Sequence, residues 1–232
     1  MKSQRDFFLS LATSMSRERL EAYRRAGADG ALLARYLWNV MLSEALYPSM
    51  QCLEVALRNS LHTSISTAYG RDDWYDSSPS ILAPRQQDAV ADAKNILVTD
   101  GKLQTPGRVV AELTFGFWTS LFNVAYETKP TGNPLLWPRL LASVFPHMPR
   151  RIRTRRMISR NLNDVRKLRN RVFHHEPIWH YARLAQQHAD ILTMIGWINR
   201  DVRDMVTLID RFPDIHATGY ARRRSLLATI TA

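Results

Sequence analysis

The ten residues LRNRVFHHEP, at positions 168–177, combine side chains that can bind a phosphate with side chains that can move a proton. Arg169, Asn170 and His174 follow the pattern R-N-x-x-x-H. On an α-helix, which turns by about 100° per residue, Asn170 and His174 share a face and Arg169 flanks them. An imidazole titrates near neutral pH, and a guanidinium presents a planar fork of donors to phosphate oxygens. Such a set could cleave RNA without a metal, because a histidine can deprotonate the 2′-hydroxyl while an arginine stabilises the charged phosphorane.

A metal site is the first alternative for this stretch. A zinc-protease helix carries His-Glu-x-x-His, which places two histidines on one face. Here His175 and Glu176 are followed by Pro177, which ends a helix, and the next histidine is His180. This spacing argues against a metal, and we expect neither a metal nor a cofactor. An ordinary basic helix end, facing solvent, is the second alternative, and the spacing alone favours it.

The segment that leads into the motif is strongly basic. Between Arg150 and Arg171, 10 of 22 residues are Arg or Lys, and Asp164 is the one acidic residue. The whole chain carries 32 basic and 21 acidic residues, a formal net charge of +11, which favours a polyanionic partner. We expect RNA, with tRNA among the candidates, rather than an anionic membrane surface, which would explain the charge but not the motif. The residues predicted to bind RNA are Arg150, Arg151, Arg153, Arg155, Arg156, Arg160, Arg166 and Lys167.

Helices must position these residues, because helix-forming side chains are abundant and few stretches alternate apolar with polar residues. An all-α chain is therefore predicted. The run 29–69 contains Pro48, which lacks an amide hydrogen and clashes with the preceding turn, so 49–69 is expected to be a separate helix. Gly27 is expected to end the preceding helix. Further helices are predicted around 86–97, over the apolar stretch 109–126, from about 151 to 174, and after Pro177 up to about 212, with a loop at 127–134.

One helical domain is the simplest organisation for 232 residues of which 45% are apolar. We place an N-terminal helix or arm at 1–14, the helical domain at 15–212 and a basic C-terminal tail at 213–232. The single cysteine, Cys52, lies in an apolar run, which predicts burial and fits a reducing compartment. Neither a signal peptide nor a membrane-spanning run is recognisable, so a cytoplasmic location is expected. The predicted core includes Trp38, Trp118 and the phenylalanines of the FGFW sequence.

The sequence RKLRNRVFHHEPIW closely resembles the signature of Abi-like proteins, the abortive-infection branch of the HEPN superfamily. Upstream pieces are similar as well and occur in the order typical of that family: RLEAYRRAGAD, ALLARYLWNVMLSEALYPSMQCLEVALRNSLH, YGRDDWYD and ELTFGFWTSLF. The resemblance covers roughly residues 15–200 and implies an all-α HEPN helical bundle with additional helices. It further implies a metal-independent endoribonuclease that leaves a 2′,3′-cyclic phosphate and acts in defence against phage.

The resemblance also assigns roles to the motif. It implies that His174 is the general acid–base, that Arg169 binds and stabilises the scissile phosphate, and that Asn170 supports the histidine or the ligand. In HEPN ribonucleases two protomers pair so that both motifs line one cleft. This implies a homodimer, which makes chemical sense because acid and base on opposite sides of a phosphate need two groups. The family context leaves room for a neutralising partner protein.

Other positions are candidates for supporting roles. His175 and Glu176 either cap the helix end before Pro177 or extend the cleft, and His175 lies one turn after Arg171. The sequence EVALRNSLH repeats Arg-Asn, but its histidine comes one position too early for the motif. The family context places this sequence on a neighbouring core helix, where Glu54 or Arg58 could pair with motif residues or form a buried ion pair between helices. The possible supporting residues are thus Arg171, His175, Glu176, Glu54, Arg58 and Asn59.

A non-catalytic function is the alternative to the ribonuclease. A HEPN module could bind nucleic acid or a nucleotide, or could assemble with a partner protein, without any cleavage. The complete set of Arg169, Asn170 and His174 favours the enzyme, since a degenerate motif would have favoured the binding module.

Overall fold

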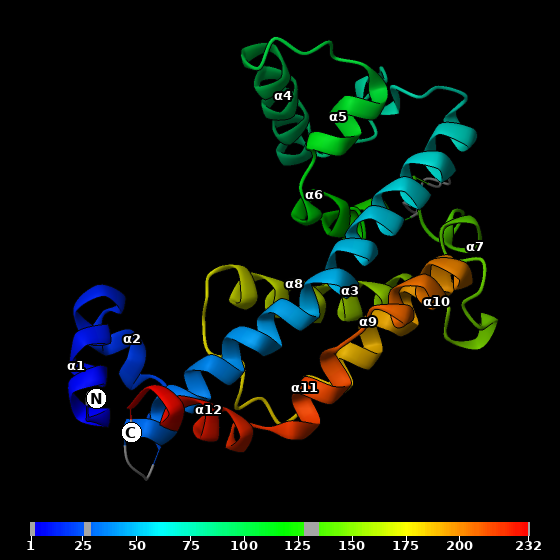
Figure 1. The fold of residues 1–232 in the computed structure, drawn as a ribbon. Helices are drawn as coiled ribbons and strands as arrows, with labels where there is room; N and C mark the ends of the chain where they lie inside the picture. Colours follow the sequence, from blue (N-terminus) through cyan, green and yellow to red (C-terminus); the bar gives the residue numbers. More distant parts are fainter. Residues whose placement is uncertain (1–2, 26–28, 128–134, 232) are drawn as a thin grey trace. The chain divides into compact units, whose positions relative to one another are not determined.

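The structure, a computed structural model, describes residues 3–25, 29–127 and 135–231. This part of the chain is helical, with one isolated bridge between Glu127 and Trp137 and no strand in the described residues. The predicted all-α class is therefore confirmed. The helix end expected at Gly27 and most of the loop expected at 127–134 lie outside the described residues. Figure 1 shows the helices coloured along the sequence from blue to red.

The chain packs into two compact units, each assembled from separate stretches of sequence. Helices α3 (Asp29–Tyr69) and α8 (Arg155–Phe173) contribute residues to both units. Neither unit is thus an independent segment of the chain, in keeping with a single all-α domain. The first unit consists of Met1–Met50, Lys167–Ala189 and Thr207–Ala232, and the second of Gln51–Arg166 and Asp190–Val206.

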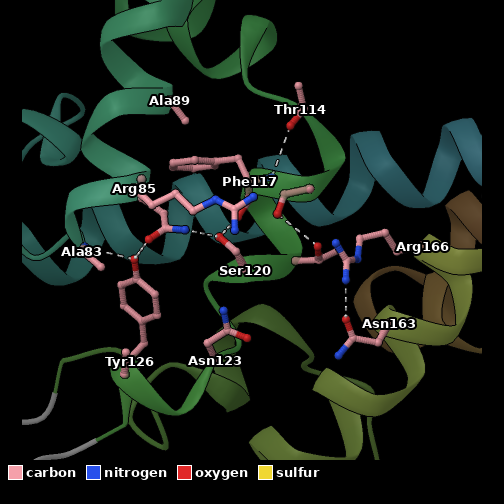
Figure 2. A pocket seen from close by; sticks show the side chains of 14 residues that line it. Ala83, Arg85, Ala89, Thr114, Phe117, Ser120, Asn123, Tyr126, Asn163 and Arg166 are labelled. Atoms are coloured by element: carbon pink, nitrogen blue, oxygen red, sulfur yellow. Dashed lines mark hydrogen bonds between the residues drawn. The ribbon is translucent and has the colours of Figure 1, made fainter. Parts of the chain in front are cut away.

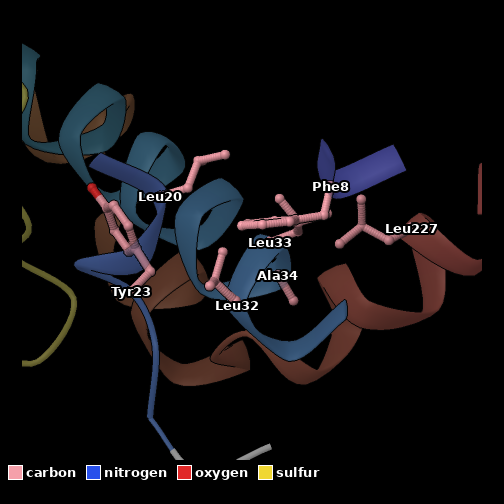
Figure 3. Close-up of a cluster of buried hydrophobic side chains, with 7 residues drawn as sticks. All are labelled: Phe8, Leu20, Tyr23, Leu32, Leu33, Ala34 and Leu227. Atoms are coloured by element: carbon pink, nitrogen blue, oxygen red, sulfur yellow. The ribbon is translucent and has the colours of Figure 1, made fainter. Parts of the chain in front are cut away.

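The first unit contains both ends of the sequence. A cluster of buried apolar side chains holds it together, and Figure 3 shows Phe8 and Leu227 in this cluster with residues of α2 and α3. The segments set apart as an arm at 1–14 and a tail at 213–232 therefore both supply core residues. The helices of this unit, besides parts of α3, α8 and α9 (Leu184–Ile198), are α1 (Gln4–Met15), α2 (Arg17–Glu21), α11 (Phe212–Thr218) and α12 (Ala221–Thr231).

The second unit is built around large aromatic residues. Trp118 and Trp137 are fully buried, and Trp137 stacks on Phe122 with a centroid distance of 4.4 Å. The predicted burial of Trp118 and the FGFW phenylalanines is confirmed, whereas Trp38, in the first unit, is half-buried and donates its indole N–H to Ile215 O. The remaining elements are η1 (Trp74–Asp76), α4 (Pro84–Thr99), α5 (Pro106–Glu112), α6 (Phe115–Ser120), η2 (Val124–Tyr126), α7 (Leu141–Val144), η3 (Arg150–Ile152) and most of α10 (Arg200–Leu208).

Helix α3 continues through Pro48, and the predicted break at this residue is wrong. The proline removes the amide that would bond to the carbonyl of Glu44, a loss that usually costs a helix several kcal/mol. Buried leucines on both sides of Pro48, including Leu46 and Leu53, offset this loss by packing. The next residue, Ser49, donates its hydroxyl to the carbonyl of Leu46 at 2.9 Å. Tertiary packing therefore overrides the local preference.

Replacing Pro48 with alanine is expected to stabilise the protein. Alanine restores one helix hydrogen bond and removes the ring clash. It also raises the conformational entropy of the unfolded chain, which offsets part of this effect. The free energy of unfolding is therefore expected to rise by about 1–2 kcal/mol. Urea denaturation of wild type and P48A measures the change. Pro84→Ala is the matched control, because Pro84 lies in the first turn of α4, where no amide is needed. A less stable P48A would show that the proline is favoured by its surroundings.

Two helices predicted as continuous are divided by polar capping residues. The stretch 109–126 breaks at Leu113, because Thr114 leaves the helical conformation and its hydroxyl accepts the amide of Phe117 at 3.3 Å. The stretch after Pro177 similarly ends α9 at Ile198. There the Asn199 side chain accepts amides of α10, at 2.9 Å from Asp201. These predictions were wrong because apolar periodicity continues across both caps.

A buried histidine–aspartate contact lies in the first unit. His188 is 5% exposed, and its Nε2 lies 3.0 Å from Oδ2 of Asp210. The imidazole also stacks on the ring of Phe212 at a centroid distance of 4.3 Å. Burial lowers the pKa of His188 below its ordinary value; Asp210 opposes this shift and His216 adds to it. His188 therefore resists protonation in the folded protein.

The free energy of unfolding is expected to fall as the pH drops below the unfolded histidine pKa of about 6.5. The sign follows from proton linkage: the unfolded chain binds a proton at His188 that the folded protein disfavours, so acid shifts the equilibrium toward unfolding. Urea denaturation between pH 7.5 and pH 5.0 measures this slope. H188Q is expected to show a shallower slope than wild type. Equal slopes for wild type and H188Q would contradict the assignment.

Among the residues that the structure describes, no helix combines the length and the apolar character that crossing a bilayer requires.

Candidate active site at the end of helix α8

Helix α8 ends within the R-N-x-x-x-H motif, in the first unit. His175 adopts a left-handed backbone conformation, with φ of 57°. Its amide donates to Val172 O at 3.1 Å, and the Glu176 amide donates to Arg171 O at 2.8 Å. These two bonds form a Schellman cap with histidine at the position where glycine is usual. The backbone of His175 and Glu176 thus caps the helix, and Pro177 prevents its continuation.

The motif side chains lie on two neighbouring strips of α8. Asn170 and His174, four residues apart, are both exposed. Arg169 and Phe173 form the adjacent strip, rotated by about 100°. The Arg169 guanidinium lies over the Phe173 ring, 4.5 Å from its centroid. Phe173 also contacts Tyr47 of α3, with a centroid distance of 6.0 Å. The exposed imidazole of His174 therefore lies on the strip next to the Arg169 guanidinium, which packs against an aromatic pair.

The next residues form a charged border around the helix end. Arg171 pairs with Glu176, at 3.2 Å between Nη1 and Oε2, and also lies over Tyr181. Arg171, which the sequence places one turn before His175, thus forms an ion pair with Glu176. Arg19 of α2 approaches the His175 carbonyl at 3.5 Å. Partial burial, and then the positive charges of Arg25 and Arg171, lower the pKa of nearby His180 below its ordinary value.

Asn39 of α3 fixes the chain directly after the motif. Its side-chain oxygen accepts the amides of Ile178, at 2.7 Å, and of Trp179, at 3.1 Å. Asn39 is 4% exposed, so this contact is shielded from water. Asn39 is not among the residues that the sequence predicted for the site. The available signal was a pair of polar residues four apart, Arg35 and Asn39, within an otherwise apolar helical run, and the structure buries both.

The candidates from EVALRNSLH belong to the second unit. Arg58 is half-buried and donates Nη1 to Ala111 O at 3.4 Å. Asn59 is exposed, and Glu54 is half-buried. A pairing of Glu54 or Arg58 with the motif stays a prediction. Nearby Cys52 is half-buried, and this burial raises the pKa of its thiol, which does not favour a reactive thiolate.

Some of the predicted RNA-binding residues make contacts within the protein, and others are exposed. Arg155 is held by Glu127, at 2.5 Å, and by the Phe122 carbonyl, at 2.8 Å. Arg153 donates to Phe145 O at 3.4 Å. Both therefore have structural contacts that the charge pattern did not reveal. The exposed members are Arg150, Arg151, Arg156, Arg160, Arg166 and Lys167, of which only Lys167 belongs to the first unit.

No cluster of three or more His, Cys, Asp or Glu side chains suited to a metal ion occurs in the residues that the structure describes. The end of α8 carries an imidazole, an amide and a guanidinium, a set of groups suited to a phosphodiester ligand.

Comparisons of the chain with protein-family models, with curated proteins and with solved structures found no match.

Proposed function

We propose that the chain is a metal-independent endoribonuclease of the HEPN type. One observation carries this proposal: Asn170 and His174 are exposed on one strip of α8, and Arg169 lies on the adjacent strip against Phe173. The resemblance of the sequence RKLRNRVFHHEPIW to the Abi-like signature supports the same conclusion. The chain would act on RNA, with tRNA among the candidates, in the cytoplasm and in defence against phage.

The proposed reaction needs only groups that act on a proton or on charge. The His174 imidazole removes the proton of the 2′-hydroxyl, and the resulting oxygen attacks the adjacent phosphorus. Arg169 stabilises the negative charge that develops on the phosphoryl oxygens. The P–O5′ bond then breaks, the leaving 5′-oxygen takes a proton, and a 2′,3′-cyclic phosphate remains on the upstream fragment. Asn170 would orient His174 or the RNA.

The proton for the leaving group requires a second acid. One protomer supplies one motif histidine, so a two-fold dimer would provide the second from the partner copy. Light scattering coupled to size exclusion tests this part of the proposal. A dimer at the protein concentration of the cleavage assay is expected, and a fully active protein that is strictly monomeric would contradict the shared cleft.

The test of the function is cleavage of total RNA by the purified protein in EDTA, with the H174A variant purified in parallel. Cleavage that survives chelation, disappears in H174A and leaves 2′,3′-cyclic ends supports the ribonuclease. Equal cleavage by both preparations would identify a contaminant. RNA that binds in a salt-dependent manner without being cleaved would favour the alternative, a non-catalytic HEPN module. A protein that co-purifies with the chain and inhibits RNA cleavage when it is added back would be the neutralising partner.

A further inference from the structure

A polar cavity lies within the second unit, which does not contain the residues of the R-N-x-x-x-H motif. It has a volume of about 480 Å³, which is within the range of small-molecule sites. The first turns of α4, the helix α6, η2 and the middle of α8 line it. Figure 2 shows these elements around the cavity, with Arg85 and Arg166 reaching into it from opposite sides.

The charged side chains that line the cavity are all positive. Arg85 and Arg166 line it, and no Asp or Glu is among its lining residues. Both arginines are exposed, and neither forms an ion pair with a carboxylate in the described part of the chain. Arg166 donates to the side-chain oxygen of Asn163 at 3.4 Å, a long contact that a stronger acceptor could replace. The two guanidinium groups thus provide donors for an anion.

Hydrogen bonds that are buried or partly buried hold the side chains at the floor of the cavity. Gln86 is 8% exposed, donates to Ser120 Oγ at 3.0 Å and accepts from the Tyr126 hydroxyl at 3.0 Å. The Tyr126 hydroxyl in turn accepts the amide of Ala83 at 3.2 Å, and Ser120 donates to Phe117 O at 2.6 Å. A site with this floor would not need to reorganise when a ligand binds, which reduces the cost of binding.

The remaining lining groups suit an organic molecule rather than a bare ion. Asn123 and Asn163 present amides that can both donate and accept hydrogen bonds. The ring of Phe117 adds an apolar surface (Figure 2). Two cationic donor groups, neutral polar groups and one ring in the same lining together match a small molecule that carries a phosphate at one end.

We propose that this cavity binds a small phosphomonoester. The phosphate would lie between Arg85 and Arg166, and the amides of Asn123 and Asn163 would bind the polar organic part. This site goes beyond the proposed ribonuclease, because it needs neither His174 nor RNA. In this proposal Arg166 binds a specific small ligand, whereas the sequence predicted that it binds RNA as part of the basic segment.

Isothermal titration of the full-length protein, in buffer of physiological ionic strength, tests the site with three probes: inorganic phosphate, ribose 5-phosphate and adenosine 5′-monophosphate. Saturable binding of at least one probe is expected, and the tightest of the three identifies which part of the ligand is recognised. R85Q and R166Q are each expected to weaken that binding by about 10- to 100-fold, as loss of a charge-assisted hydrogen bond predicts.

Two further variants test whether ligand binding depends on the cavity itself. Arg160→Gln removes the same charge from an exposed position of the same helix outside the cavity, and binding is expected to stay within about twofold. Ala89→Leu fills the cavity without changing charge and is expected to abolish binding. Circular dichroism melting of each variant without ligand shows that it folds. No saturation by any probe at millimolar concentration, an equal loss in R160Q, or unchanged binding in A89L would each overturn the proposal. The outcome is independent of RNA cleavage, so the two proposals fail separately.

Discussion

Replacing His174 with alanine is expected to lower the single-turnover rate constant of RNA cleavage by about 10²–10⁴-fold, the usual contribution of a general acid–base group. His174 follows the last residue of α8 and is exposed, so its removal leaves no cavity in the core. The free energy of unfolding is therefore expected to change by less than about 0.5 kcal/mol. RNA affinity is expected to stay nearly constant, because the imidazole acts on the reacting proton. Single-turnover cleavage of a defined RNA, with affinity measured separately, resolves the two effects.

His175→Asn is the matched control for this prediction. It removes an exposed imidazole one residue away, and asparagine tolerates the left-handed conformation that position 175 requires. H175N is expected to cleave RNA within about threefold of wild type. A rate that falls as far in H175N as in H174A would show that the helix end as a whole, and not His174, supports the reaction. An unchanged rate in H174A would remove the proposed chemistry altogether.

Replacing Asn39 with leucine is expected to destabilise the protein by about 2–4 kcal/mol. Leucine has a similar volume but no acceptor, so the amides of Ile178 and Trp179 would lose their partner in a shielded environment. Each unsatisfied buried donor costs about 1–3 kcal/mol. Cleavage is expected to fall as well, because Asn39 fixes the chain directly after the motif. Urea denaturation gives the stability, and the same RNA assay gives the activity of the folded fraction.

Two variants separate this contact from a general effect of altering α3. Asn59→Leu removes an exposed amide from the same helix and is expected to change stability by less than about 0.5 kcal/mol. Asn39→Asp keeps an oxygen acceptor for both amides, so it is expected to lose less stability than N39L. If N39D and N39L were equally unstable, the hydrogen bonds to the 178–179 segment would not be what stabilises the fold.

The sequence predicted those parts of the fold that depend on local periodicity. Helix α4 was expected around 86–97 and spans Pro84–Thr99, and α8 was expected from about 151 to 174 and spans Arg155–Phe173. Breaks between helices were less predictable, because each depends on one residue whose context decides the outcome. Pro48 lies in α3 without ending it, while Thr114 and Asn199 interrupt apolar patterns that continue past them. Packing decides the first case and side-chain hydrogen bonds decide the other two.

The candidate site was predictable only where its residues are close in sequence. The spacing of Asn170 and His174 placed them on one face of a helix, and both are exposed there. The contacts of Tyr47 with Phe173, and of Asn39 with the segment after Pro177, join parts of the chain more than a hundred residues apart. The cavity between Arg85 and Arg166 depends likewise on tertiary packing, which no local pattern encodes.

The cluster that includes Phe8 and Leu227 constrains the order of events during synthesis on the ribosome. The motif residues are translated before residue 227, yet they belong to the unit that this cluster holds together. That unit cannot complete its core until Leu227 has emerged from the exit tunnel. The unit that carries the motif would therefore stay incompletely folded in the nascent chain until Leu227 has emerged, so a nuclease built in this way would not reach its active structure before that point.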